Sequence, residues 1–202
     1  MKTAILFLVN EYADWEGAYL SSILNTSKEW EVKTASIEKQ VTSIGGFKTT
    51  VDYLIDELPE KIDTFILIGG NNWQISNDTL LEKVTTFLNS NLIVGAICGA
   101  VDYLAKNGLL TPYKHTGNAL FFWQEYEKYT TLENFLEVQC VSDKNLVTAN
   151  GTAAIDFTEA LLEKLNFETE KVRHREIGLQ RLGYYDYVEK FEIRFINKKS
   201  LF

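Results

Sequence analysis

Short apolar runs recur along the chain, and segments with helical periodicity separate them. Runs at 4–9, 64–68, 92–97 and 146–149 predict strands, and 32–36 is a weaker strand candidate. These runs are continuously apolar and do not alternate with polar residues. That pattern is typical of strands in a parallel sheet that is covered on both faces.

The intervals between the runs carry helix signals. Helices are expected after capping residues or before a glycine stop, at 15–24 (cap Asp14), 79–88 (cap Asn77 or Asp78), 100–106 (stop at Asn107-Gly108) and 152–165. Strands that alternate with helices indicate βαβ units. The predicted fold class is therefore α/β with a mostly parallel sheet.

The stretch from residue 167 onward differs from the rest. A charged helix is followed by Gly183-Tyr-Tyr-Asp-Tyr and by Phe191, Phe195 and Phe202. We interpret 167–202 as a C-terminal helical extension that packs on the core or on a partner subunit. Residues 1–202 are thus expected to form a single domain with this appendage.

Charge and cysteine content narrow the partners and the compartment. The formal net charge of −8 repels phosphate backbones, so no nucleic acid is expected as a partner. Two cysteines, Cys98 and Cys140, are too few for a disulfide scaffold and fit a reducing cytoplasm.

The apolar run at 4–9 is followed at once by Asn10 and Glu11, which predicts a buried strand and not a signal peptide. No run reaches the ~20 residues that span a bilayer, so no membrane is expected. The sequence gives no reason to expect a metal ion or a cofactor.

Three loops should meet at one edge of the sheet, because ligands bind beyond the carboxyl ends of parallel strands. The first is Asp-Trp-Glu-Gly at 14–17, the second begins with Gly69-Gly70, and the third is Cys-Gly-Ala at 98–100. They offer a carboxylate, backbone N–H groups and a thiol. We expect the functional site at this edge.

Cys98 is the strongest candidate for chemistry. It follows a buried strand and precedes a helix, and Ala96, Gly99 and Ala100 leave room for the sharp turn that presents a nucleophile. The N-terminus of the helix is expected to stabilise a thiolate and to lower the pKa of the thiol. The alternative is a buried, inert cysteine.

Glu16 and the glycine pair gain meaning beside such a thiol. Glu16 would be a proton partner of Cys98, with a pKa raised by partial burial; otherwise it is a surface residue in a first helical turn. Gly69 and Gly70 would offer N–H groups to an oxyanion together with the amide of Gly99; otherwise they mark only a turn.

Taken together, these pieces resemble the PfpI family of the class I glutamine amidotransferase-like superfamily, which includes intracellular cysteine peptidases and a deglycase. The matching segments follow the family order and cover most of residues 3–166; they are 4–9, 14–17, 65–70, 94–100 and 147–153. The resemblance implies a flavodoxin-like three-layer sandwich and a homodimer. It also implies Cys98 as the nucleophile, Glu16 hydrogen-bonded to its sulfur, and oxyanion donors near Gly70 and Gly99.

One position departs from the family pattern. Peptidase-like members place a histidine directly after the cysteine, where this chain has Gly99. Other members carry a histidine later in the chain, where our alignment places Asn118. His115 comes three residues before Asn118; it is a candidate base if its loop is shifted, or a strand residue that points away. His174 lies in the charged C-terminal helix, where we expect it to be solvated.

Three functions compete. The first is cysteine-dependent hydrolysis of a peptide, an amide or a small carbonyl adduct, with Cys98 attacking and His115 or Glu16 moving the proton. The second is a stress or redox protein in which Cys98 is oxidised and Glu16 hydrogen-bonds the product. The third is a binding module that kept the fold and lost the chemistry. The expected ligand is a small molecule or a peptide. Five aromatic residues could line its pocket, or belong to the core or an interface: Trp15, Trp73, Phe121, Phe122 and Trp123.

Overall fold

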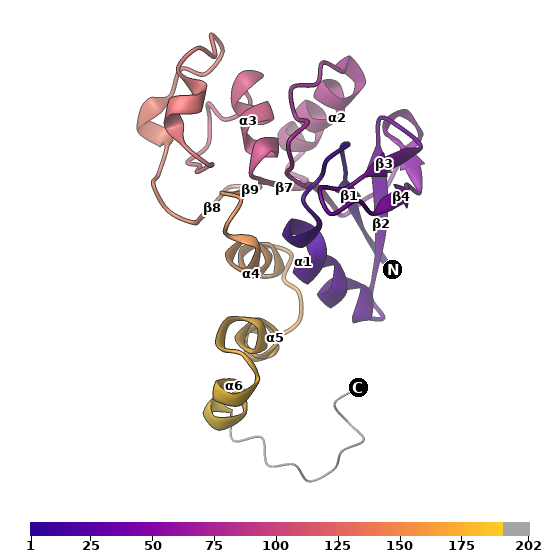
Figure 1. The fold of residues 1–202 in the computed structure, drawn as a ribbon, viewed down its shortest axis with the longest axis vertical. Coiled ribbons are helices and arrows are strands. Elements are labelled where there is room, and N and C mark those ends of the chain that lie inside the picture. Colours follow the sequence, from indigo (N-terminus) through magenta and orange to yellow (C-terminus); the bar gives the residue numbers. More distant parts are fainter. Residues whose placement is uncertain (192–202) are drawn as a thin grey trace.

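The centre of the molecule is a seven-stranded sheet with helices on both faces (Figure 1). A computed structural model describes residues 1–191. The strand order is β5-β2-β1-β6-β7-β9-β8, and all neighbours pair in parallel except β8, which is antiparallel to β9. The strands are β1 (Lys2–Phe7), β2 (Trp30–Ser36), β5 (Tyr53–Leu54), β6 (Thr64–Leu67), β7 (Ile93–Ile97), β8 (Cys140–Asp143) and β9 (Leu146–Ala149).

Each face of the sheet is buried under a pair of helices. The helices are α1 (Asp14–Thr26) and α4 (Ala154–Lys164) on one face, and α2 (Asp78–Asn89) and α3 (Gly99–Lys106) on the other. Successive residues of a strand enter opposite cores: Leu6 packs in the α1/α4 core, and Phe7 packs in the α2/α3 core. This is why the strands are apolar throughout.

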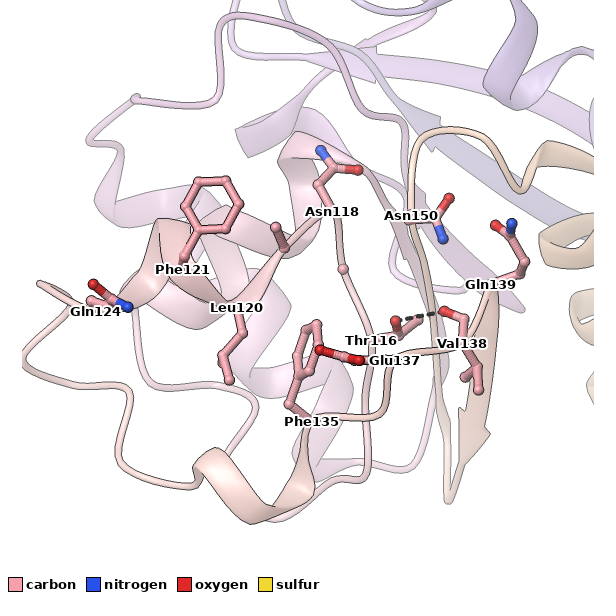
Figure 2. Close-up of a pocket in the computed structure, with 12 residues that line it drawn as sticks. Thr116, Asn118, Leu120, Phe121, Gln124, Phe135, Glu137, Val138, Gln139 and Asn150 are labelled. Atoms are coloured by element: carbon pink, nitrogen blue, oxygen red, sulfur yellow. Dashed lines mark hydrogen bonds between the residues drawn. The ribbon is translucent and has the colours of Figure 1, made fainter.

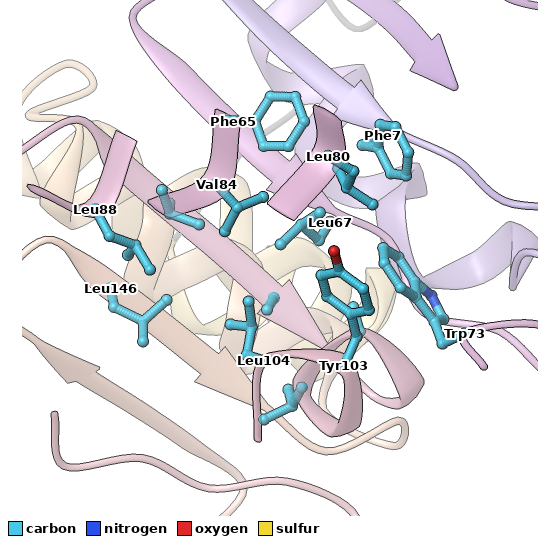
Figure 3. Close-up of a cluster of buried hydrophobic side chains, with 14 of the residues drawn as sticks. Phe7, Phe65, Leu67, Trp73, Leu80, Val84, Leu88, Tyr103, Leu104 and Leu146 are labelled. Atoms are coloured by element: carbon cyan, nitrogen blue, oxygen red, sulfur yellow. The ribbon is translucent and has the colours of Figure 1, made fainter. Parts of the chain in front are cut away.

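The α2/α3 core is built from aromatic and branched side chains (Figure 3). Phe7 and Phe65 from neighbouring strands lie with their ring centroids 5.8 Å apart. Leu80 and Val84 of α2 and Leu104 of α3 are 0% exposed. This face of the sheet is a packed core.

The helices and strands expected from the apolar pattern are confirmed, with bounds that shift by at most two residues. One capping prediction was wrong: α1 begins at Asp14 itself, whose carboxylate accepts a hydrogen bond from the Gly45 amide at 2.8 Å. Of the two candidates for α2, Asn77 is the cap, because its Oδ1 accepts from the amide of Leu80 at 2.9 Å.

Several short elements were not predicted, because no apolar run marks them in the sequence. They are the hairpin β3 (Gln40–Thr42) and β4 (Lys48–Thr50), the edge strands β5 and β8, and the 3₁₀ turns η1 (Ile55–Glu57), η2 (Leu120–Trp123) and η3 (Leu132–Asn134). Edge strands and turns have at least one exposed side, so their sequences lack the continuous apolar character of the central strands.

The C-terminal helices α5 (Glu170–Leu182) and α6 (Tyr184–Lys190) stack outward from α4 (Figure 1). Ile177 of α5 is buried in the α1/α4 core, and Arg181 contacts Asp156 at 2.9 Å and Glu159 at 2.6 Å on α4. Of the two placements expected for the appendage, its described part therefore packs on the core of its own chain. Phe195 and Phe202 lie outside the described residues. Within residues 1–191, no helix combines the length and apolar character needed to cross a bilayer.

Strand register brings four strand ends together. Phe7 pairs with Leu67, which in turn pairs with Ala96 of β7. Ile97 pairs with Ala149 at the end of β9. The loops after β1, β6, β7 and β9 therefore start at the same edge of the sheet, where an open α/β fold places its ligand site.

Candidate functional site

Cys98 occupies a sharp turn between β7 and α3. Its backbone dihedrals are φ 57° and ψ −129°, a region that residues with a Cβ rarely adopt. Such a conformation costs about 1–3 kcal/mol and persists only where neighbouring contacts impose it. One such contact is the hydrogen bond from the Cys98 amide to the Ala149 carbonyl, at 3.0 Å. The turn that the small neighbours predicted is present, and the thiol is half-buried at the sheet edge.

The carboxyl group of Glu16 lies beside this thiol, in the first turn of α1. Glu16 is 1% exposed, so the alternative that it is a surface residue in a first helical turn is wrong. Neither carboxyl oxygen has a hydrogen bond of normal geometry within residues 1–191. Burial raises the pKa of Glu16 to about 7, although the neighbouring Cys98 thiol and the Gly69 amide act to lower it.

The pKa of the Cys98 thiol is raised, contrary to the prediction from the helix N-terminus. Burial is the largest cause, and the negative charge of Glu16 adds to it. The side chain of Asn118 and the amide of Gly99 act in the opposite direction but do not outweigh burial. Burial thus raises the pKa of both members of the pair.

Asn118 contacts the sulfur directly. Its Nδ2 donates to Cys98 Sγ at 3.3 Å, and its Oδ1 accepts from the backbone amide of Gly151 at 2.9 Å. The second bond fixes the orientation of the amide, because a backbone N–H needs an acceptor. The structure therefore brings Asn118, the residue that the sequence resemblance aligned with a histidine, to the sulfur. An amide can stabilise a thiolate there but cannot take up its proton.

Of the two placements considered for His115, the structure has the one in which the ring contacts groups other than the thiol. The side chain is 0% exposed. Its Nδ1 lies 2.8 Å from the Tyr113 carbonyl oxygen, and its Nε2 lies 2.8 Å from the Tyr129 hydroxyl. Both ring nitrogens thus have partners elsewhere, and burial lowers the pKa of the imidazole. His174 is exposed on α5, as expected.

Two glycines allow the backbone to crowd around the site. A Cβ added at Gly69 would lie 2.4 Å from Glu16 Oε2 and 2.5 Å from Cys98 Cβ. A Cβ added at Gly151 would lie 2.9 Å from Cys98 Sγ. Gly151 was not among the predicted site residues. Its position after the strand at 146–149 could have indicated it, because that strand ends at the same edge of the sheet as the three loops that were considered.

The backbone amides expected to hold an oxyanion have different surroundings. The Gly99 amide lies against the sulfur of Cys98. The Gly69 amide lies against the carboxyl group of Glu16. Gly70 and Gly99 remain as candidates for oxyanion donors.

A pocket of about 630 Å³ includes Asn118 in its wall (Figure 2). Asn118 lines this pocket while it donates to the sulfur. The rest of the wall comes from 116–124, 135–139 and Asn150. Of the five aromatic residues that sequence analysis left open, Phe121 lines the pocket, whereas Trp73 and Trp123 are 2% and 1% exposed in the core.

Comparisons with known proteins agree on the family and the fold. A model of the DJ-1/PfpI family matches residues 2–164. The chain is 45% identical over 197 residues to the uncharacterized protease YdeA of Bacillus subtilis (strain 168), covering 98% of this chain and 100% of that protein. It is 34% identical over 172 residues to the uncharacterized protease YoaZ of the same strain, covering 80% and 82% of the two chains. The crystal structure of a thiJ/pfpI family protein from Bacillus anthracis has 32% identity and a TM-score of 0.86, covering 95% of this chain and 97% of that one. The family resemblance and the flavodoxin-like α/β fold expected from the sequence are both confirmed.

Proposed function

We propose that this chain, which belongs to the DJ-1/PfpI family, is a cysteine-dependent hydrolase of a peptide or small amide in which Glu16 moves the proton. The names of the two Bacillus relatives as proteases support a protease-type family. The observation that carries the proposal is the set of groups around one sulfur. Cys98 sits between a buried carboxyl group, the Asn118 amide and the N–H of Gly99.

Glu16 takes the role that a histidine has in other cysteine hydrolases. A pKa of about 7 suits a group that must accept a proton and then release it near neutral pH. Cys98 Sγ bonds to the carbonyl carbon while its proton passes to Glu16, and the carbonyl electrons move onto oxygen. Glu16 then gives the proton to the leaving nitrogen as the C–N bond breaks and a thioester remains. Water then attacks the thioester carbon while one of its protons passes to Glu16. The C–S bond breaks to release the acid product, and Glu16 returns the proton to the sulfur.

The charge that develops on the carbonyl oxygen needs fixed donors. The N–H groups of Gly99 and Gly70 follow the ends of β7 and β6, and the Nδ2 of Asn118 already faces the sulfur. Donors held in place before the reaction stabilise the tetrahedral intermediate without reorganisation. In this proposal the strained turn at Cys98 keeps the sulfur within reach of these groups.

Turnover of a fluorogenic peptide library at pH 7.5 tests the proposal. Cys98→Ala is expected to reduce cleavage to background, and Glu16→Gln to reduce it by about 10²–10⁴-fold, because a general base is lost. Cys140→Ala is the matched control and is expected to keep full activity. Full turnover by Cys98→Ala would contradict the proposal.

A second candidate function is redox sensing at the same cysteine. It is favoured by the contact of the sulfur with a buried carboxyl group while the ring nitrogens of His115 are engaged elsewhere. The raised pKa of Cys98 weighs against it, because the thiolate is the form that peroxide oxidises. Peptide mass spectrometry after mild peroxide distinguishes the two: sensing requires oxidation of Cys98 well before Cys140, and equal oxidation of both thiols excludes it.

A further inference from the structure

We propose that the pocket beside Cys98 is a subsite for an uncharged, peptide-like amide that carries an apolar side chain, and that Glu137 excludes anionic ligands from it. The inference rests on the proposed function only in taking Cys98 as the reacting group. It adds the charge and the side-chain type of the substrate, which neither the fold nor the names of the relatives specify.

The pocket is linked to the thiol through Asn118. Asn118 lines the pocket and donates to Cys98 Sγ at 3.3 Å. Asn150 also lines it and precedes Gly151, where an added Cβ would lie 2.9 Å from the sulfur. A ligand that fills the pocket is therefore flanked by the residues that surround the nucleophile.

One wall of the pocket is apolar. Leu120, Phe121 and Phe135 contribute to it. Phe121 is 63% exposed and contacts Phe122 at a centroid distance of 4.2 Å. An aromatic ring left so exposed at the rim of a cavity gains free energy when a ligand covers it. This wall fits an apolar side chain.

The opposite wall carries two primary amides, those of Asn150 and Gln139 (Figure 2). Asn150 Oδ1 accepts from the Thr152 amide at 3.0 Å and from the Thr152 hydroxyl at 2.7 Å. The oxygen end of Asn150 is thus engaged, and its NH₂ group is the end left for a ligand. An N–H donor held in this way fits the carbonyl oxygen of an amide.

The negative charge of the pocket wall disfavours anionic ligands. Among the described residues that line the pocket, Glu137 is the only one with a charged side chain. Glu16 places a second carboxyl group beside the sulfur. A ligand carboxylate or phosphate would meet like charge without a cation to offset it, whereas a neutral amide would meet matched donors and an apolar wall.

Alkylation of Cys98 by three matched N-substituted iodoacetamides tests the subsite. The probes carry a phenethyl, a carboxyethyl or an aminoethyl group, and in each reaction the sulfur displaces iodide. Rates are measured by mass spectrometry in the Cys140→Ser background and divided by the rates with N-acetylcysteine. We expect the phenethyl probe to saturate and to react about tenfold faster than the carboxyethyl probe, from apolar burial and charge repulsion together.

Two pairs of variants separate the parts of the pocket. Glu137→Gln is expected to raise the relative rate of the carboxyethyl probe about threefold, and Glu133→Gln, an exposed glutamate outside the pocket, to leave it unchanged. Phe121→Ala is expected to slow the phenethyl probe about fivefold, and Phe47→Ala, a phenylalanine that is 68% exposed elsewhere, to have no effect.

The ratios between probes report on the pocket, and the absolute rates report on the thiol. Equal normalised rates for all three probes, or ratios that Glu137→Gln and Phe121→Ala leave unchanged, overturn the subsite. A Cys98 that reacts no faster than N-acetylcysteine with any probe, yet keeps the expected ratios, counts against the proposed hydrolase and leaves the subsite standing.

Discussion

The side-chain nitrogen of Asn118 lies 3.3 Å from the sulfur of Cys98 and donates a hydrogen bond to it. The amide is held by its second bond, to the N–H of Gly151 at 2.9 Å. It stabilises negative charge on the sulfur but accepts no proton. The proton of the thiol therefore has one nearby acceptor among the residues described, the buried carboxyl group of Glu16.

Asn118→Ala is expected to slow the reaction of Cys98 with iodoacetamide at pH 7 by about three- to tenfold, because the thiolate loses a hydrogen bond worth about 1 kcal/mol. The pH profile of the rate should shift upward. Mass spectrometry of both cysteines measures this, with Cys140 in the same protein as the internal standard. An unchanged profile would show that the amide does not act on the sulfur.

Glu16→Gln is expected to make the protein more stable at high pH. The carboxyl pKa is about 7 in the folded state against 4.5 for the free group, so between pH 4.5 and 7 the unfolded chain releases a proton that the folded chain keeps. The free energy of unfolding of the natural protein therefore falls as pH rises through this window, by about 3 kcal/mol in all. The variant lacks this loss.

Urea unfolding at pH 4, 6 and 8 measures the effect. The difference between Glu16→Gln and the natural protein should be smallest at pH 4 and largest at pH 8. Glu29→Gln, at an exposed glutamate, is the control and should follow the natural protein throughout. Parallel stability curves for Glu16→Gln and the natural protein would mean that the carboxyl group is ionised normally.

Gly69→Ala is expected to lower the free energy of unfolding by about 3 kcal/mol or more, because the new methyl group has no room. It would lie 2.5 Å from the Ile97 carbonyl oxygen and from Cys98 Cβ. Gly46→Ala is the comparison: its φ is +85°, but nothing lies within 4 Å. That variant should lose only about 1 kcal/mol, from backbone strain. Equal losses in thermal or urea unfolding would contradict the crowding at Gly69.

His115→Phe separates a structural histidine from a catalytic one. The ring keeps its aromatic neighbours but leaves the Tyr113 carbonyl and the Tyr129 hydroxyl without their partner. We expect the free energy of unfolding to fall by about 1–3 kcal/mol. The pH profile of Cys98 alkylation should stay the same. If Cys98 in the folded variant were alkylated about 100-fold more slowly, His115 would have to act on the thiol.

The central fold could be predicted because burial on both faces leaves a plain mark on the sequence. A run such as Thr64-Phe-Ile-Leu67 has no polar face, and only a covered parallel strand accommodates it. The hairpin at Gln40–Thr42 and Lys48–Thr50 leaves no such mark, because half of its side chains face solvent. The homodimer that the family implies stays a prediction.

The sequence predicted which loops meet at the candidate site and that burial raises the pKa of Glu16, but it did not predict the raised pKa of the thiol. Strand order places Glu16, Cys98 and the glycine loops at one edge, and that follows from the βαβ pattern alone. Burial raises the pKa of the thiol and the Gly99 amide lowers it, so the direction of the shift depends on which effect is larger. The sequence places the cysteine at a helix N-terminus but does not reveal how deeply it is buried. The position of His115 depends on Tyr113 and Tyr129, whose contacts form only in the folded chain.

The pocket wall and the reacting groups come from separate parts of the chain. Cys98 and Gly69 follow the ends of strands and Glu16 lies in the first turn of α1, whereas most of the wall belongs to 119–139, a stretch of turns between α3 and β8. Loops of this kind tolerate exchange far better than strand ends do. A chimera that carries the 119–139 segment of another family member should therefore acquire that member's ligand preference while Cys98, Glu16 and Asn118 stay unchanged.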